Sequence, residues 1–420
     1  MTGRIEAFIS RGGVMFHRVL CLIILVLAAA TAAANAQTPA RLTLQSALEL
    51  ADKQNLDLGA ARRRRAVALA GIQVAKQRPN PTINFGALRD APHESLFFSQ
   101  PLELGSKRQR RIEVARQEGV LTEAEITVLA RLVRRSTREA FYRALLARAE
   151  TARLAGVLQL AQRLKQIAQA RFEAGDVAQL EVIQAELGVS RAQADLEVAQ
   201  QREKVSLSQL NALLNEPAST AWELTGGLAD ALPEASPPEL FRRAAQSNPE
   251  LQRLAQEQRV EQSRRELLKA DRIPNLDFEL GTDFNSPQDF RVGPRSQVSL
   301  TVPLFARNQG QIAQSLASEQ VLVNESAAAA RAVEGRIDAG YLDLKAQQTQ
   351  VMLYRDRLLP VARQVEGLAE ESYRAGKVGI LAVIEAQRNV QEADRSYLES
   401  LFTLQSLFAA LEETVGEPLD

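Results

Sequence analysis

A chain of 420 residues is long enough for two or three ordinary domains. Its 51 basic and 51 acidic side chains balance, so its net charge excludes a general attraction to nucleic acids or other polyanions. Aromatic residues make up only 5% of the chain, and Ala, Leu, Gln, Glu and Arg fill long stretches, a composition typical of long helices and coiled coils.

The first 36 residues are predicted to be a signal peptide, cleaved after Ala36. His17 and Arg18 form a basic region, an apolar run of residues 19–30 follows, and residues 34–36 form a small-residue cleavage site. Residues 1–14 are atypical of a basic region, which favours Met15 over Met1 as the translation start.

The sequence contains a single cysteine, Cys21, within the apolar run. A lipid-attachment cysteine follows such a run, so we interpret Cys21 as a small apolar residue of the signal peptide. The mature chain is therefore predicted to have no disulfide and no thiolate metal site.

The mature chain repeats itself once. The segment "NLDL" from Asn55 corresponds to "NPEL" from Asn248, 193 residues later. The segment "RFEAGDVAQLEVIQAE" from Arg171 returns as "SYRAGKVGILAVIEAQ" from Ser372, 201 residues later. Landmarks in the same order at nearly constant offset predict two tandem repeats. These are residues 37–216 and 238–420, joined by a linker at 217–237.

Each repeat is predicted to begin with a helix, over 44–78 and 238–272, followed by a β-hairpin. The hairpins are expected at about 82–103 and 275–305, because apolar and polar residues alternate there, as in "LDFELG" from Leu276. Two interpretations remain open. The hairpins form a small sheet that caps a helical domain, or they are membrane strands, which need about 9–11 residues of this alternation.

Helical hairpins are predicted over 104–215 and 307–415, with their tips at Gly175 and Gly376. Each outgoing arm has about 70 residues and a length of roughly 105 Å, and Pro360 should kink the second arm. The return arms, 177–215 and 378–415, are about half as long. We expect each return arm to stack end to end on the first helix of the other repeat.

Four strands are too few to close a transmembrane barrel. We therefore expect a mainly α fold with a small β part, in which a trimer forms a 12-stranded β-barrel on top of an α-helical barrel.

The mature chain resembles the TolC family of outer-membrane efflux ducts. The resemblance rests on the two tandem copies, on the strand-to-helix passages "PLELGSKR" and "PLFARNQG", and on the two glycine tips. The stretch "QPLELGSKRQRRIEVA" is similar to the heavy-metal branch of the CzcC and CusC type.

This resemblance implies a homotrimer in outer-membrane lipid that spans the periplasm. It acts as the passive exit duct of a tripartite efflux system, with a periplasmic adaptor and a resistance-nodulation-division pump. The expected cargo is heavy-metal cations, with drugs or small molecules as the alternative, since selectivity belongs mainly to the pump.

The resemblance also implies that the tips form the channel entrance, closed by polar links and lined by acidic groups. By position, Tyr373 is expected to link to Glu181, and Glu385 to form an acidic ring. The second position that is acidic in the family is occupied here by Ala382, and the position of the family's arginine is occupied by Val378. We expect Lys377 to compensate for that arginine. The competing interpretation is that Glu181 and Glu385 are ordinary solvated helix positions.

Other chemistry finds little support. The run Arg62–Arg65 points all round a helix, as a solvated surface does, and His93 alone makes no metal site. We find no nucleophile elbow, phosphate loop or spaced metal ligands. The chain is predicted to be a non-enzyme without cofactor or metal. The rival class is a soluble periplasmic coiled-coil scaffold.

Overall fold

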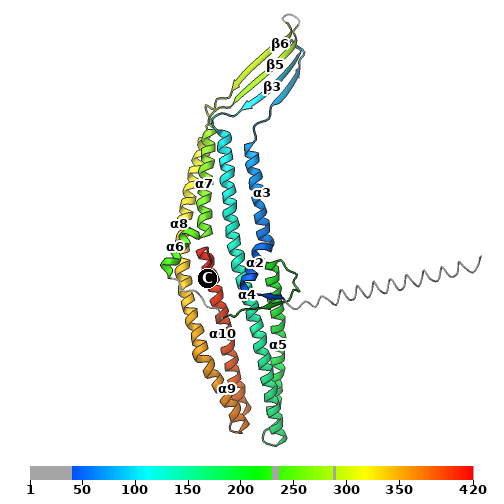
Figure 1. Cartoon of the computed structure of the whole chain (residues 1–420), viewed down its shortest axis with the longest axis vertical. Helices are drawn as coiled ribbons and strands as arrows, with labels where there is room; N and C mark the ends of the chain where they lie inside the picture. Colours follow the sequence, from blue (N-terminus) through cyan, green and yellow to red (C-terminus); the bar gives the residue numbers. More distant parts are fainter. Residues whose placement is uncertain (1–39, 229–235, 287–289, 420) are drawn as a thin grey trace, which may run out of the picture.

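The computed structural model describes residues 40–228, 236–286 and 290–419. The predicted signal peptide lies outside these residues. The molecule is elongated, with a β-sheet at one end and two helical layers below it (Figure 1). None of the helices in the described part of the chain has the length and apolar character needed to cross a membrane.

The sheet has four antiparallel strands in the order β2-β3-β5-β6, so the two hairpins of the sequence lie side by side. Strands β2 and β6 form its two edges, and each has one side unpaired. The second hairpin is shorter than expected at its end, because β6 stops at Leu300 and residues 301–308 form an irregular passage. The strands are β2 (Thr82–Ala87), β3 (Glu94–Leu102), β5 (Leu276–Ser286) and β6 (Phe290–Leu300).

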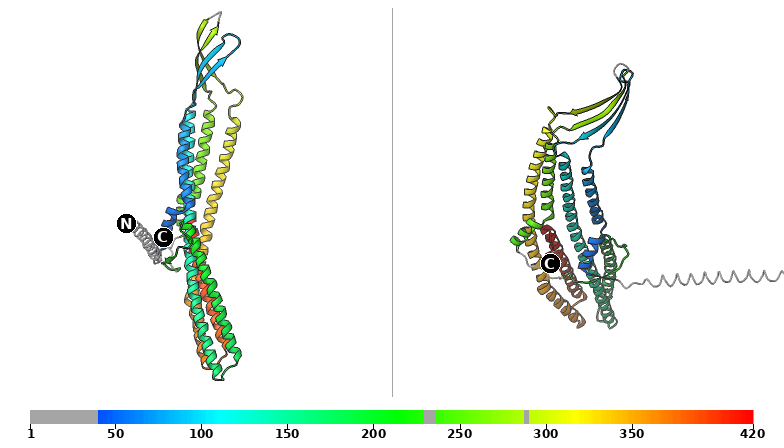
Figure 2. Two further views of the ribbon diagram at one scale, coloured as in Figure 1. Left: turned by 90° about the vertical axis from the view of Figure 1, so that its right-hand side faces the viewer. Right: turned by 45° about the horizontal axis from the view of Figure 1, so that its top comes forward.

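Helix α4 (Lys107–Glu173) runs through both helical layers and organises them (Figures 1 and 2). In the layer next to the sheet, the order of packed helices is α3-α4-α7-α8. In the far layer the order is α5-α4-α10, and α10 packs on its other side against α8 and α9. The packed partners are α3 (Leu56–Lys76), α5 (Gln179–Leu214), α7 (Pro249–Ala270), α8 (Gln309–Leu353), α9 (Leu359–Arg374) and α10 (Ile380–Val415).

The first helix of each repeat, expected to be continuous, is divided by an asparagine. Asn55 separates α2 (Leu44–Gln54) from α3, and Asn248 separates α6 (Pro237–Ser247) from α7. Each asparagine caps the second helix of its pair, and its side-chain oxygen accepts the backbone N–H three residues on, at 3.0 Å in both cases. The "NLDL" and "NPEL" landmarks are therefore helix caps.

The same asparagines join the two layers. The Asn55 amide donates to the carbonyl of Leu213 at 3.1 Å, and the Asn248 amide donates to the carbonyl of Thr414 at 2.6 Å. These carbonyls lie in the last turns of α5 and α10, where helices leave carbonyls without an internal partner. Each return helix thus stacks on the first helices of its own repeat.

The predicted stacking on the other repeat is wrong. The first helices of the two repeats have nearly equal length, so matching lengths could not choose between them. The bonds of the capping asparagines show the pairing that is made, because each joins the return helix of its own repeat.

The second outgoing arm is interrupted, in agreement with the kink expected at Pro360. A π-helical turn over Tyr354–Leu358 separates α8 from α9. Proline has no N–H to donate to the carbonyl of Asp356 four residues back, so the regular helical ladder breaks on that side.

The main core lies at the middle of the molecule, where the layers meet. Its largest buried side chains are Phe141 and Tyr142 of α4 and Phe408 of α10. The rings of Phe141 and Tyr142 pack edge to face, with their centres 5.8 Å apart. Beside the core, β1 (Ala40–Leu42) pairs in parallel with β4 (Trp222–Leu224). This places the apolar core around the junction rather than along the whole length.

Gly416 ends α10 at this junction and provides a stability test. Its φ is +89°, and an added Cβ would meet the Ser247 carbonyl oxygen and lie 2.8 Å from the Cα of Asn248. We expect Gly416→Ala to destabilise the fold by about 1–3 kcal/mol, lowering the melting temperature of detergent-solubilised protein followed by helical circular dichroism. Gly59→Ala in α3 is the control, because an added Cβ there meets nothing within 4 Å. Equal melting temperatures for the two variants would contradict this account.

Candidate functional site at the hairpin tips

Both helical hairpins turn at a glycine in the left-handed conformation. Gly175 has a φ of +82° and Gly376 a φ of +71°. At the first tip, the Gly175 N–H donates to the Phe172 carbonyl and the Asp176 N–H donates to the Arg171 carbonyl, both at 2.9 Å. The second tip repeats this pair of bonds. This pattern closes a helix with glycine in the turn, which explains why the sequence repeats a glycine at these points.

The two tips are linked by Tyr373 of α9. Its hydroxyl donates to a carboxylate oxygen of Glu181 in α5 at 2.9 Å, so the structure brings together the two residues paired in the sequence analysis. The Tyr373 residue is fully buried, with an exposed fraction of 0%. It belongs to a small apolar cluster at the tips whose other buried members are Leu164, Ala168, Ala185, Ile380 and Val383.

Arg171, in the last turn of α4, contacts both the ring and the backbone of Tyr373. Its guanidinium lies 4.8 Å from the centre of the Tyr373 ring, and its Nη1 donates to the Tyr373 carbonyl at 3.0 Å. Sequence reasoning missed this residue. Its position could have indicated the contact. Arg171 comes one residue before Phe172, the aromatic residue of the first tip, and therefore faces the second tip when the two hairpins pack together.

The environment of Tyr373 keeps its phenol protonated. The pKa of Tyr373 is raised from 10.0 to about 12, mainly by burial and further by the hydrogen bond and the negative charge of Glu181, whereas Arg171 lowers it. The raised pKa means that the protonated phenol is favoured by folding. Its contribution to stability is complete below pH 10 and is lost as the pH rises through about 12.

Glu385 and Lys377 do not join this link. The Glu385 side chain is 68% exposed and lies 3.9 Å from Arg388. Lys377 is exposed in the second turn, and the cation that contacts Tyr373 is Arg171. Val378 packs against the apolar cluster of the tips. Arginine contact with the second tip is thus present, but it comes from the first hairpin.

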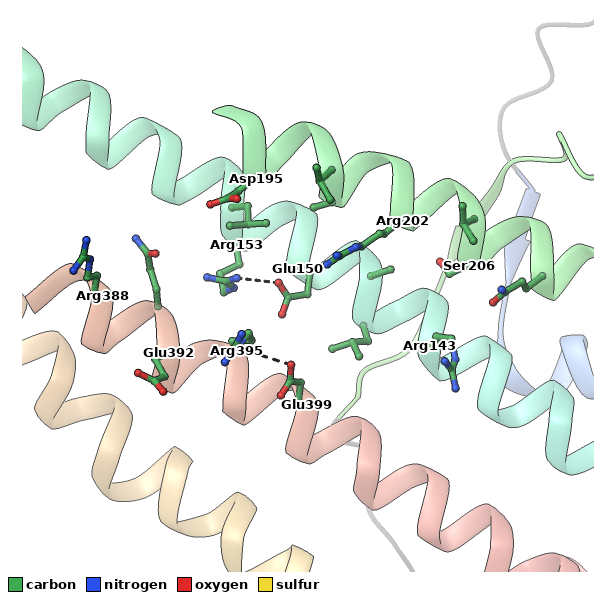
Figure 3. Close-up of a pocket in the computed structure, with 18 residues that line it drawn as sticks. Arg143, Glu150, Arg153, Asp195, Arg202, Ser206, Arg388, Glu392, Arg395 and Glu399 are labelled. Carbon is green, nitrogen blue, oxygen red and sulfur yellow. Dashed lines mark hydrogen bonds and ion pairs between the residues drawn. The ribbon is translucent and has the colours of Figure 1, made fainter. Parts of the chain in front are cut away.

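Glu385 lines a groove that is formed by residues of α4, α5 and α10. This groove has a volume of about 780 Å³ near the tips and continues into a second hollow of about 950 Å³ closer to the core (Figure 3). The two hollows share Asp195, Arg388 and Gln391, so they form one continuous surface along the helices. Charged side chains of both signs point into the second hollow (Figure 3): Arg143, Glu150, Arg153, Asp195, Arg202, Arg388, Glu392, Arg395 and Glu399.

Within the described ranges, no group of three or more His, Cys, Asp or Glu side chains is placed to hold a metal ion. The groove carries charged side chains of both signs. The arrangement combines a partly buried polar link at the tips with a charged groove wall behind it.

Comparison with known proteins decides the family. The family model described as outer membrane efflux protein matches residues 47–216 and 240–417. The chain belongs to this family. The two matched segments correspond to two copies of the same unit, and they contain the two tips and the groove described above.

Individual relatives of the outer membrane efflux family agree with this assignment. The cobalt-zinc-cadmium resistance protein CzcC of Cupriavidus metallidurans is 26% identical over 384 residues, which cover 89% of this chain and 90% of that protein. Among solved structures, CusC matches with a TM-score of 0.75 and 15% identity, over 89% of this chain and 92% of its own. The outer membrane protein VceC of Vibrio cholerae matches with a TM-score of 0.73 and 15% identity, over 90% and 97%. The fold is that of these channels.

The Tyr373–Glu181 bond can be measured by tyrosine titration. Subtracting the ultraviolet titration of Tyr373→Phe from that of the wild type isolates the Tyr373 phenol. We expect that component to titrate near 12 in the wild type and at a lower pH in Glu181→Gln, which removes the charge that disfavours the phenolate while leaving the burial in place. A Tyr373 component that titrates at the same pH with and without the Glu181 carboxylate would show that the bond is absent.

Proposed function

We propose that the protein is the exit duct of a tripartite efflux system, assembled from three copies of the chain. The observation that supports this most strongly is the common order of elements in all three layers. In the sheet and in both helical layers, one edge comes from the first repeat and the other from the second. A unit with two different edges in every layer joins head to tail into a ring.

The edges carry the surfaces that such a ring needs. Strands β2 and β6 each leave one row of backbone groups unpaired, which is not tolerated in lipid. The helices at the edges expose large apolar side chains, and three copies joined at these edges provide twelve strands, enough for a closed barrel. The exposed apolar residues are Val67, Leu69 and Val74 of α3, Leu180, Ile183 and Leu187 of α5, Leu316, Val321 and Val323 of α8, and Val361, Val365 and Leu368 of α9.

We propose that the tips form the inner entrance of this duct. The groove that contains Glu385 lines the passage, because its charged wall suits a water-filled lumen. The Tyr373–Glu181 bond, with Arg171 beside it, ties the two hairpins of one copy together and holds the resting entrance narrow. Three Glu385 carboxylates then form an acidic ring just inside it.

The cargo is proposed to be heavy-metal cations, on the strength of the similarity to CzcC over 89% of the chain. The duct is passive and non-enzymatic in this proposal. Its partners are a periplasmic adaptor and an inner-membrane pump, which meet it at the tips. A ring of acidic side chains at the entrance attracts cations without coordinating them tightly, as conduction requires.

Divalent-cation block tests the entrance. Purified protein in a planar bilayer should conduct, and Co²⁺ added on the tip side should block the current. We expect Glu385→Gln to weaken this block by about tenfold, since each of three copies loses a charge facing the ion. The measurement is single-channel current against Co²⁺ concentration.

The control is Glu186→Gln. Glu186 also lies near the tip on α5, but it pairs with Lys165 at 2.8 Å and is absent from the lining of the groove. This variant should keep the block of the wild type. Absence of any channel in the wild type would contradict the duct itself, and a block that Glu385→Gln leaves unchanged would remove Glu385 from the entrance.

A further inference from the structure

One row of the sheet brings together an aromatic ring, a glycine and an arginine. Phe97 of β3 pairs with Gly281 of β5, and Gly281 pairs with Arg295 of β6. The Arg295 guanidinium reaches across the glycine and lies 5.3 Å from the centre of the Phe97 ring. A Cβ added to Gly281 would collide with Phe97, because it would lie only 2.9 Å from the Phe97 Cα. Glycine is what allows the ring and the cation to meet.

Alternation along the strands places this row on the polar face of the sheet. The neighbouring rows on that face contain Ser95 and Ser99 of β3 beside Asp283 and Glu279 of β5. The opposite face is apolar and exposed, with Ile83, Phe85, Leu96, Phe98, Phe278, Leu280, Val298 and Leu300. In a barrel, the apolar face meets lipid and the polar face lines the interior. Phe97 and Arg295 therefore point inward.

The polar face is acidic except at this row. Strand β5 carries Asp277, Glu279 and Asp283 there, and over these described rows Arg295 is the one cationic side chain. Arg295 is fixed by more than the ring, because its guanidinium lies 3.9 Å from Asp283 and donates to Gln297 at 3.2 Å. Arg291 lies further out on the same strand, beyond Asp283. The cation is therefore held in one place on an acidic wall.

We propose that Arg295 sets the charge selectivity of the outer half of the duct. This inference rests on the trimeric duct proposed above. Three copies form a ring of three guanidinium groups, each lying against Phe97, between the inner carboxylates of Asp277 and Glu279 and the outer carboxylate of Asp283. The ring lowers the preference for cations that the acidic wall would otherwise impose, and it makes the wall bind passing cations less tightly.

The orientation can be tested by cysteine labelling. Cys21 is the single cysteine of the sequence and lies in the predicted signal peptide, so an introduced cysteine is the one thiol of the mature chain. A membrane-impermeant sulfonated thiol reagent should label Arg295→Cys and leave Val298→Cys, on the apolar face, unlabelled. The reverse pattern would overturn the inference and the inward-facing polar surface of the barrel together.

Selectivity can be tested in bilayers under a KCl gradient. The measured quantity is the ratio of K⁺ to Cl⁻ permeability from the reversal potential, with the entrance widened by Tyr373→Phe in every variant. We expect Arg295→Gln to raise the ratio by about twofold or more, because each copy loses an inward cation. Arg295→Lys keeps the charge and should keep the ratio. Glu279→Gln, which removes an opposite charge from the adjacent row, should lower it.

The outcomes separate the two proposals. If the background protein forms no channels, the duct is wrong and this inference fails with it. If channels form but Arg295→Gln leaves the permeability ratio unchanged, the duct stands and the role of Arg295 is overturned. If Arg295→Lys raises the ratio as much as Arg295→Gln, charge is not the determinant and the inference is also overturned.

Discussion

The structure depends on one constraint, the unpaired edges of a four-stranded sheet. Strands β2 and β6 leave backbone N–H and C=O groups without partners, and a bilayer offers no water to satisfy them. A single chain cannot meet this demand, because four strands do not close. The helical layers repeat the same problem with apolar side chains at their edges. One solution, a ring of identical copies, satisfies all three layers at once.

The long α4 carries this constraint from the sheet to the tips. It packs against helices of both layers, and Asn55 and Asn248 join the stacked helices beside it end to end. At the far end, Tyr373 ties the second hairpin to the first through Glu181 and Arg171. A displacement of one hairpin at the tip must therefore break a partly buried hydrogen bond, which gives the narrow entrance that we propose a physical cause.

Much of this architecture was readable from the sequence, because periodicity and duplication report it directly. The strands, the long helices and the glycine tips follow from spacing, whereas the Tyr373–Glu181 pair was expected from the resemblance to the TolC family. The stacking partners of the return helices did not, since helix lengths are alike and an asparagine cap resembles a helix interior. Arg171 was also missed, because its contact with Tyr373 depends on how two hairpins pack, 202 residues apart in the chain. The Phe97–Arg295 contact needed the strand register for the same reason.

The number of copies in the assembled protein tests the central claim most directly. Native mass spectrometry of the mature chain, released from mild detergent, measures it without any substitution. The account predicts one dominant species with three times the mass of the chain, because three copies with four strands each supply the twelve strands of the proposed barrel. A stable single-copy species, with the sheet intact and its edges unpaired, would contradict it.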